Sequence, residues 1–304
     1  MAASASLDIN RRHDFVLLFD VQDGNPNGDP DAGNLPRVDP ETMQGLVTDV
    51  ALKRKVRDYV DVKQGDEGRY KIYVQNGEAL ITKHKRAYEA LDIKSTGVKQ
   101  NRAEVEQVRA WMCQNFFDIR MFGAVMTVGV NAGQVRGPLQ LTFARSIDRI
   151  LSLDLSITRV AVTREEDAAV VVAEESGEGS GGKQTEMGRK AIVPYGLYRA
   201  YGFFNAALAE QTGVSEEDLA LFWEALSAMW DVDRSASRGF MACQGLYVFS
   251  HDSALGNAPA HRLFDHITIT RDADIPRGFG DYTVTAPPDG PLVEFPGVTL
   301  ERLV

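Results

Sequence analysis

Residues 15–21, FVLLFDV, form a short run of apolar, β-branched and aromatic side chains. A run of this length and composition is typical of a buried strand. The stretch that follows it, DGNPNGDPDAGN at 23–34, is rich in the residues that dominate turns for backbone reasons. We therefore expect a buried first strand followed by a turn-rich connection to a helix.

The same stretch partly matches a calcium-binding loop. Asp23, Asn25, Asn27 and Asp29 follow the spacing of such a loop, but Asn34 stands where a bidentate Glu normally closes it. A helix must also precede a loop of that type, whereas a predicted strand precedes this one. The sequence favours a turn over a metal site, and we expect no metal and no cofactor.

The composition is that of an ordinary globular protein. The chain has 304 residues, of which 44% are hydrophobic and 25% charged. No stretch reaches the roughly 20 apolar residues of a membrane span, and the N-terminus lacks the apolar centre of a signal peptide. We therefore expect a cytoplasmic protein without membrane contact. Cys113 and Cys243 match no metal-binding spacing and are expected to be buried thiols.

The charge is distributed unevenly. The net charge is −10, which argues against a general nucleic-acid binder. Residues 45–145, however, hold 17 Lys and Arg against 11 Asp and Glu, a net charge of +6. One region can therefore face phosphates while the remainder stays acidic.

A helix is predicted from the cap Asp39 and Pro40 to about Val60. Its apolar face, with Leu46 and Val50, continues into Lys53 and Arg57. Two interpretations stay open: the two cations extend from a packed helix end toward solvent, or they meet an anion.

The basic segment 61–114 has the pattern of an insertion on a core. It contains a predicted strand, YKIYV at 70–74, and two predicted helices, at 87–93 and 103–116. The segment GQVRGPLQLTFA at 133–144 predicts one strand entered through a tight turn, with Gln134 and Arg136 near its start. Turns and a ligand contact are equally good explanations of its glycines.

The C-terminal half predicts a projecting hairpin. A strand at 155–163 is followed by GEGSGG and then by the strand-like run 191–204, with Met187, Arg189 and Lys190 near the returning base. A core helix at 215–230 begins with a capping box of Ser215 and Asp218. Later strands are predicted near 243–251 and 264–271, and the Pro/Gly-rich end supports edge strands or a tail at most. The layout is α+β with a mainly antiparallel sheet.

No catalytic signature is present. The five histidines are scattered, and no zinc, nucleophile-elbow or phosphate-loop motif occurs. The carboxylates Asp23, Asp29, Asp31 and Asp39 are the one remaining constellation, because magnesium-assisted phosphodiester cleavage uses such groups. Their spacing alone does not establish that chemistry.

Several long motifs in order resemble the Cas-seven family, in particular its Csd-two branch from type I-C CRISPR systems. These are 24–42 followed by 45–58, then 123–146, 187–204 and 233–241, so that the resemblance runs from about Phe15 to His266. It implies a single elaborated domain over 1–304, whose palm is an RNA-recognition-motif-like (ferredoxin-like) antiparallel sheet. It also implies a helical finger insertion at 61–120 and a thumb hairpin at 159–195.

The resemblance further implies a non-catalytic subunit that polymerises along a CRISPR RNA as the backbone of a Cascade complex in antiviral defence. The implied partners are further copies of the chain, a Cas-five, a Cas-eight and a small subunit, and target DNA through guide pairing. The thumb would push a guide nucleotide out of the stack at regular intervals. The aromatic motif of ordinary RNA-recognition domains is absent, so stacking of bases on the sheet is not assumed.

On this resemblance, the predicted guide contacts gather in four places. The cationic helix face would bind phosphates, the turn at 134–136 would approach the RNA backbone, Met187 would wedge against a base, and a further cation lies near 238. The residues are Lys53, Arg54, Arg57, Gln134, Arg136, Met187, Arg189 and Arg238. Two alternatives remain: a metal-dependent target-RNA nuclease that uses the carboxylates of the Asp23 to Asp39 loop, and an RNA-independent self-assembling protein.

Overall fold

The structure, a computed structural model, describes residues 4–65, 68–161 and 186–304. Its central element is strand β1 (His13–Gly24), whose first nine residues are all buried. Since both faces of β1 are covered, its apolar residues run continuously instead of alternating with polar ones. The buried strand predicted at residues 15–21 is confirmed, and it is longer at both ends.

β1 lies between β10 (Glu186–Phe204) and β11 (Phe240–His251) and pairs antiparallel with both. The sheet has the order β14-β15-β11-β1-β10-β8-β4, and β7 and β9 pair with other parts of β10. Its outer strands are β4 (Gln44–Val47), β7 (Leu139–Leu141), β8 (Ala144–Arg149), β9 (Leu153–Arg159), β14 (Gly290–Pro291) and β15 (Val298–Arg302). The predicted α+β layout with an antiparallel sheet is confirmed, whereas the RNA-recognition-motif detail stays a prediction.

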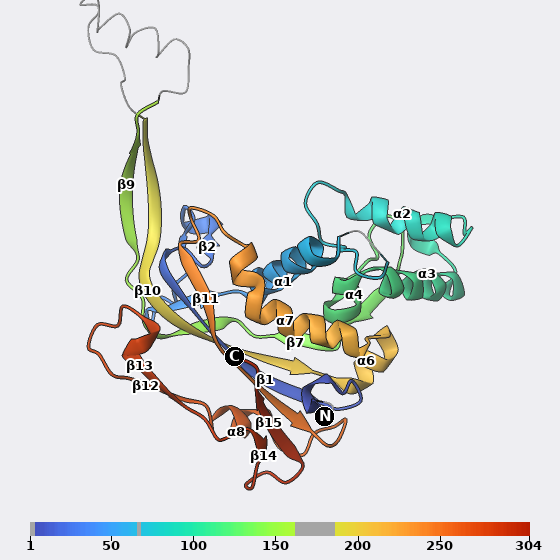
Figure 1. Cartoon of the computed structure of the whole chain (residues 1–304). Helices are drawn as coiled ribbons and strands as arrows, with labels where there is room; N and C mark the ends of the chain where they lie inside the picture. Colours follow the sequence, from blue (N-terminus) through green and yellow to red (C-terminus); the bar gives the residue numbers. More distant parts are fainter. Residues whose placement is uncertain (1–3, 66–67, 162–185) are drawn as a thin grey trace, which may run out of the picture.

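Helices α1 (Asp49–Gln64) and α7 (Glu216–Val232) cover one face of the sheet (Figure 1). The Phe19 ring of β1 stacks on Tyr198 of β10 and on Trp230 of α7, at centroid distances of 5.4 and 4.6 Å. Burying an aromatic side chain of this kind contributes about 2 kcal/mol to stability. The capping box predicted at the start of α7 is confirmed.

The helix predicted from Asp39 to Val60 is wrong in its first third. Asp39 caps a tight turn, and residues 44–47 form β4 at the sheet edge. The helix α1 begins at the cap Thr48, whose side chain accepts a hydrogen bond from the Ala51 amide. Val50 is consequently exposed, and it does not share a helical face with Leu46. Asp-Pro is an equally good turn signal, and pairing with β8 decided between the two.

The segment after α1 forms a separate layer of helices with its own apolar cluster. Its elements are α2 (Leu80–Ala90), η3 (Gly97–Lys99), α3 (Arg102–Asn115), α4 (Phe117–Phe122), β5 (Gly123–Val125) and β6 (Gln134–Arg136). The strand predicted at 70–74 is wrong, because only one isolated bridge, Lys71 to Phe116, occurs there. The strand predicted at 133–144 is divided at Gly137–Pro138 into β6 and β7, which belong to different sheets.

The C-terminal part covers the other face of the sheet. Ring stacking between Phe264 of α8 (Ala260–Phe264) and Tyr201 of β10 fixes this layer, with a centroid distance of 4.5 Å. Strands β14 and β15 form the sheet edge, which confirms the late edge strands predicted from the sequence. The shorter elements are η1 (Ala5–Leu7), β2 (Gly28–Asp29), η2 (Pro30–Ala32), β3 (Leu35–Pro36), α6 (Ala206–Thr212), β12 (Thr268–Arg271), η4 (Phe279–Asp281) and β13 (Tyr282–Thr285).

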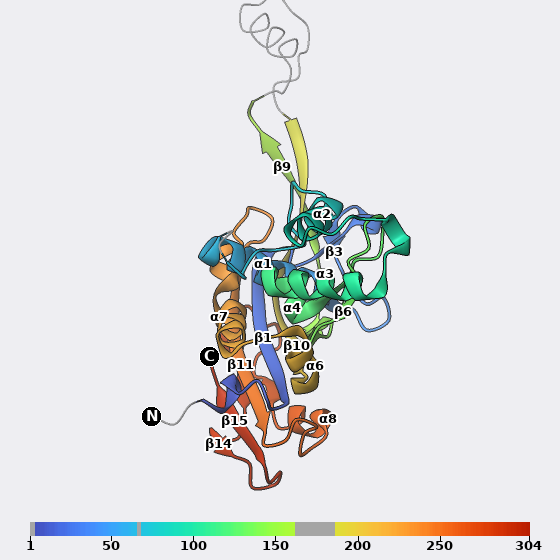
Figure 2. The ribbon, with the colours of Figure 1, turned by 90° about the vertical axis from the view of Figure 1, so that its right-hand side faces the viewer.

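β9 and the first part of β10 form a two-stranded ribbon that projects from the sheet (Figures 1 and 2). Its pairs run from Leu153–Ile192 to Arg159–Glu186, so that the ribbon begins six residues before the predicted start at 159. The predicted GEGSGG tip lies outside the described residues. No helix within 4–65, 68–161 and 186–304 is long and apolar enough to cross a membrane.

Candidate nucleic-acid interface

The loop after β1 is fixed to α1 by its amide side chains. The side-chain oxygen Oδ1 of Asn27 accepts a hydrogen bond from the backbone amide of Thr48, the cap of α1, at 2.9 Å. The Asn25 side chain donates to the Asn34 carbonyl at 2.8 Å and so closes the loop on itself. Asparagine side chains commonly support turns in this way. The motif that resembles a calcium loop is thus used to organise the backbone.

The same loop lies directly against the turn 233–239. The Asn25 amide donates to the Ser237 carbonyl at 2.7 Å. A Cβ atom on Gly24 would lie 1.9 Å from the Arg238 carbonyl oxygen, so only glycine allows this approach. Two segments that are about 200 residues apart in the sequence therefore form one surface.

Two of the four loop carboxylates act as caps. Asp29 accepts from the Asp31 amide and pairs with Arg37, and Asp39 accepts from two turn amides. The hydrogen bond from Arg145 lowers the pKa of Asp39. Within the described part of the chain, no group of three or more His, Cys, Asp and Glu has the geometry to hold a metal ion.

Lys53 and Arg57 of α1 are paired within the chain. The Lys53 ammonium contacts Asp49 at 3.0 Å and Gln140 at 3.3 Å, and the Arg57 guanidinium bonds Asp118 at 2.7 Å. Both cations also lie over the Phe122 ring, at 5.6 and 5.3 Å. Of the three cations predicted on α1, only Arg54 is well exposed, with 68% of its side chain accessible.

Arg238 belongs to a partly buried ion cluster at the other side of α1. Asp233 pairs with Arg238 at 3.1 Å and with the buried Lys55. Burial alone would raise the pKa of Asp233, but these two cations outweigh it and lower that pKa. The cluster holds the turn 233–239 against α1. Lys55 was not predicted, although its place among apolar residues of the helix was a signal for it.

Gln134 and Arg136 lie exposed on β6, which pairs with β5. Arg136 lines a groove of about 420 Å³ together with Phe122 and Gln140. Gln140 is the residue that Lys53 contacts, so the groove joins two of the predicted sites. A Cβ atom at Gly137 would lie 2.1 Å from the Phe122 backbone, which explains one glycine of this segment by close packing.

The base of the projecting ribbon carries an exposed methionine and an exposed cation. Met187 is 77% exposed, and Arg189 is held only loosely by Asp154 at 3.7 Å. Arg189 and Lys190 line a second pocket of about 290 Å³ together with Asn25, Asn34 and Ser237. The structure thus brings the ribbon, the loop after β1 and the turn 233–239 together at one site. We call this surface the ribbon-base site.

The family model of CRISPR-associated protein Cas7 matches residues 11–287. The chain belongs to the Cas7 family. The family prediction from the sequence is confirmed at this level, whereas the Csd-two branch stays a prediction.

A curated relative is the CRISPR-associated protein Cas7 of Haloferax volcanii (strain DS2). It is 27% identical over 237 residues, which are 71% of this chain. The matched part of the chain spans 64% of the length of that relative.

Three solved structures that are similar to this Cas7 chain have TM-scores below 0.5. One is titled a CRISPR RNA-guided surveillance complex, pre-nicking, with a TM-score of 0.46, 16% identity and coverage of 78% of this chain and 75% of that chain. A second, a CRISPR RNA-guided surveillance complex, has a TM-score of 0.40 and 16% identity. The match covers 77% of this chain and 68% of that chain. A third, type III-B Cmr-beta bound to cognate target RNA, has a TM-score of 0.40 and 11% identity. The match covers 78% of this chain and 61% of that chain.

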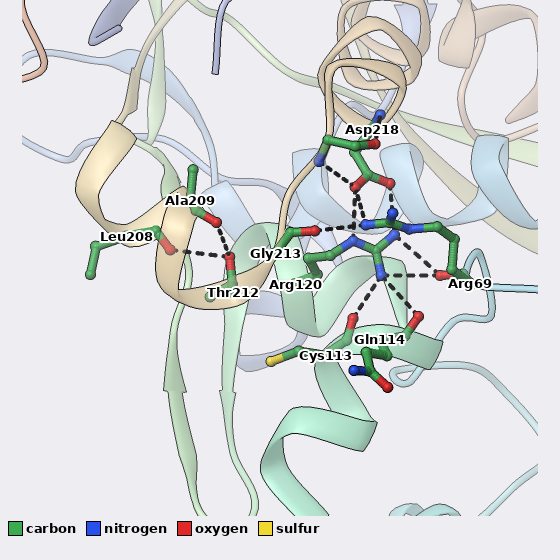
Figure 3. A network of polar contacts seen from close by, with 10 residues as sticks. Arg69, Cys113, Gln114, Arg120, Leu208, Ala209, Thr212, Gly213 and Asp218 are labelled. Carbon is green, nitrogen blue, oxygen red and sulfur yellow. Dashed lines mark hydrogen bonds and ion pairs between the residues drawn. The ribbon is translucent and has the colours of Figure 1, made fainter. Parts of the chain in front are cut away.

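A buried ion network, which the sequence did not predict, ties the helical layer of this Cas7 chain to α7 (Figure 3). The Arg120 guanidinium donates to both carboxylate oxygens of Asp218, at 2.9 and 2.7 Å, and Arg69 donates to the same group at 2.7 Å. Arg120 also donates to the Cys113 carbonyl at 2.7 Å and is completely buried. An arginine inside the apolar run FFDIRMF was the signal that could have revealed it.

Proposed function

We propose that this protein is a CRISPR RNA-binding backbone subunit of the type I-C kind. Membership of the Cas7 family carries the proposal, and the long motifs of its Csd-two branch support the finer assignment. In this role many copies bind along one guide RNA, beside Cas-five, Cas-eight and small subunits, and the guide pairs with target DNA. The sheet would serve as the RNA-recognition-motif-like palm, the helical layer as the fingers and the β9–β10 ribbon as the thumb.

The proposed guide contacts centre on the ribbon-base site. Arg189 is exposed there, with the half-buried Lys190 beside it and Asp154 in the same pocket, and phosphates bind guanidinium and ammonium donors of this kind. Arg54 and Arg136 extend the contact surface along α1 and β6. Lys53 and Arg57, which face Asp49 and Asp118, would position α1 and the helical layer and contact the guide less.

We further propose that the subunit does not cleave RNA. The side chains of Asp29 and Asp39 serve as caps and ion-pair partners, and no group of three or more His, Cys, Asp and Glu among the described residues has the geometry to hold a metal ion. No observation favours the alternative, a metal-dependent target-RNA nuclease. Incubation of the purified protein with target RNA and magnesium should yield no product, and a magnesium-dependent cut would contradict this proposal.

Co-expression with a type I-C CRISPR array and its companion subunits tests the main proposal. The purified particle should have the mass of many copies, a raised ratio of absorbance at 260 to 280 nm, and bound RNA whose sequence derives from the spacers. The same chain expressed without the array provides the control. A particle free of nucleic acid under both conditions would contradict the guide-binding function.

A further inference from the structure

A second basic pocket lies on the sheet face opposite to α1 and α7. It has a volume of about 290 Å³ and is formed mainly by β8 and β10, with Phe143, Arg145, Arg199 and Tyr201 in its wall. Arg199 and Tyr201 alternate along β10 with Tyr198 and Ala200, which pack beneath the helices. No Asp or Glu of the described residues lines the pocket, although the chain carries a net charge of −10.

Flat groups are stacked in series at this pocket. The Arg199 guanidinium lies 5.3 Å from the Tyr201 ring centroid, and Tyr201 stacks on Phe264 with an angle of 14° between the ring planes. Two hydrogen bonds between Thr142 and Tyr201 fix the start of β8 beside this stack. Phe143 stands at the rim and is 53% exposed. Rings and guanidinium planes in this arrangement are the means by which proteins bind unpaired bases.

The two arginines of the pocket are neighbours on paired strands, an arrangement that does not favour the stability of the folded chain. Arg145 and Arg199 are direct partners in the β8–β10 pairing, and like charges at such positions destabilise a sheet. Asp39 pairs with Arg145 at 2.7 Å from outside the pocket. Arg199 reaches only the Ile267 carbonyl at 3.5 Å, and none of the ion pairs found among the described residues includes it. A bound anion would stabilise the pair.

We propose that this pocket, the back pocket, binds one nucleotide of a single-stranded polynucleotide. The base would stack on Phe143, and the phosphate would lie between Arg145 and Arg199. A duplex does not fit this chemistry, because its bases already stack on one another. The back pocket is separate from the ribbon-base site, so a complex that holds its guide RNA could bind a second strand here.

The test uses the complete guide-loaded complex, in which the guide occupies its own site. Fluorescein-labelled decathymidylate and decauridylate are titrated separately and followed by anisotropy. Phe143→Ala should weaken binding of at least one oligomer about tenfold. Arg199→Gln should weaken it as well and reduce the slope of log affinity against log salt by about 0.7. The oligomer whose binding falls more identifies the ligand as DNA or as RNA.

Two further variants serve as controls. Arg302→Gln removes an arginine that lies 5.2 Å from the Tyr247 ring in the same kind of stack, and it should leave oligomer binding unchanged. Phe143→Trp should retain binding, and base stacking should quench the new indole fluorescence. Unchanged affinity for both oligomers in Phe143→Ala and Arg199→Gln would overturn the proposal. The proposal would also be overturned if the complex bound an acidic peptide but neither oligomer.

The test also separates the two proposals of function. If Phe143→Ala loses oligomer binding while guide RNA stays bound, the result supports the back-pocket proposal and does not bear on guide binding. If no guide RNA copurifies, the guide-binding function fails, and the same titration on the RNA-free chain still tests the back pocket. If Arg189→Ala abolishes oligomer binding to the same degree as Phe143→Ala, a single site explains both results and the back-pocket proposal falls.

Discussion

Helix α1 and the β9–β10 ribbon both carry cations that the sequence placed in contact with a guide RNA, yet their surroundings differ. On α1, Lys53 and Arg57 face Asp49 and Asp118 and are largely covered by protein. On the ribbon, Arg189 has one ion-pair partner among the described residues, Asp154 at 3.7 Å, and is 82% exposed. A cation that already has a buried carboxylate partner contributes to stability, and an exposed cation is free to bind phosphate.

The difference also separates the roles of the two regions. The paired cations connect layers: Arg57 reaches Asp118 of α4, and Arg120 of α4 reaches Asp218 of α7. The helical layer is therefore fixed to the sheet by ion pairs as well as by apolar contacts. Substitutions in this group should change the free energy of unfolding, whereas substitutions on the ribbon should change RNA affinity.

The largest effect on the free energy of unfolding is expected at Arg120, which is completely buried. Arg120→Ala leaves the buried Asp218 carboxylate with Arg69 as its remaining cation, and should lower the free energy of unfolding by about 3–5 kcal/mol. Urea titration followed by circular dichroism measures this change. Arg102→Ala, which removes an exposed arginine paired with Glu106 on α3, should cost less than about 1 kcal/mol. Equal losses in the two variants would contradict the distinction between buried and exposed cations.

His13 represents the opposite way to bury a basic group, because burial keeps it neutral. Burial lowers the pKa of His13 to about 4 from its ordinary value of 6.5. The unfolded chain therefore binds a proton between these pH values that the native chain does not, and stability falls as the pH falls. The loss between pH 6.5 and 4 should amount to about 3 kcal/mol.

Urea titrations at pH 7, 6, 5 and 4 measure this dependence. His13→Gln keeps a donor for the Asp8 carbonyl and an acceptor for Ser250, the two partners of the ring, but it does not titrate. The variant should therefore lose less stability between pH 6.5 and 4 than the unmodified protein. Identical pH dependence in the two proteins would assign the loss to other groups.

Arg57 tests the comparison directly, since its role was predicted to be RNA binding. Arg57→Ala removes one charged hydrogen bond from Asp118, which keeps the Tyr73 and Val74 amides as donors. Stability should fall by about 2 kcal/mol. The salt dependence of guide binding should not change, because no phosphate contact is lost. A reduced salt slope with unchanged stability would return Arg57 to the RNA-binding surface.

How far the sequence predicted the fold depended on whether local pattern or pairing decided each segment. The buried β1 and the capped α7 followed from local composition and were predicted correctly. The segment 39–47 had a helix-like start, but its pairing with β8 made it a strand. Local sequence does not contain that information, because the partner strand lies about 100 residues away.

The candidate site shows the same limit. Spacing placed Lys53 and Arg57 on one side of α1, where both lie over the Phe122 ring, but it gave no sign of Asp118, which comes from a different helix. It also gave no sign that Arg189, Asn25 and Ser237 meet at one pocket. Gly24 carried a partial signal, since a close approach of two backbones requires a glycine. Which backbone approaches it emerged only from the structure.

The smallest effect on stability, and the clearest on binding, is expected at the ribbon. Arg189→Ala should leave the free energy of unfolding within about 0.5 kcal/mol, because the side chain is exposed and its ion pair is long. The slope of log affinity against log salt for guide RNA should fall by about 0.7, the value for one phosphate contact on a single strand. Arg102→Ala, which removes an even more exposed arginine on the outer helix α3, provides the control and should leave the slope unchanged. If both variants leave the slope unchanged, the ribbon does not contact guide phosphates; if both reduce it, RNA binding follows overall charge and has no defined site at the ribbon base.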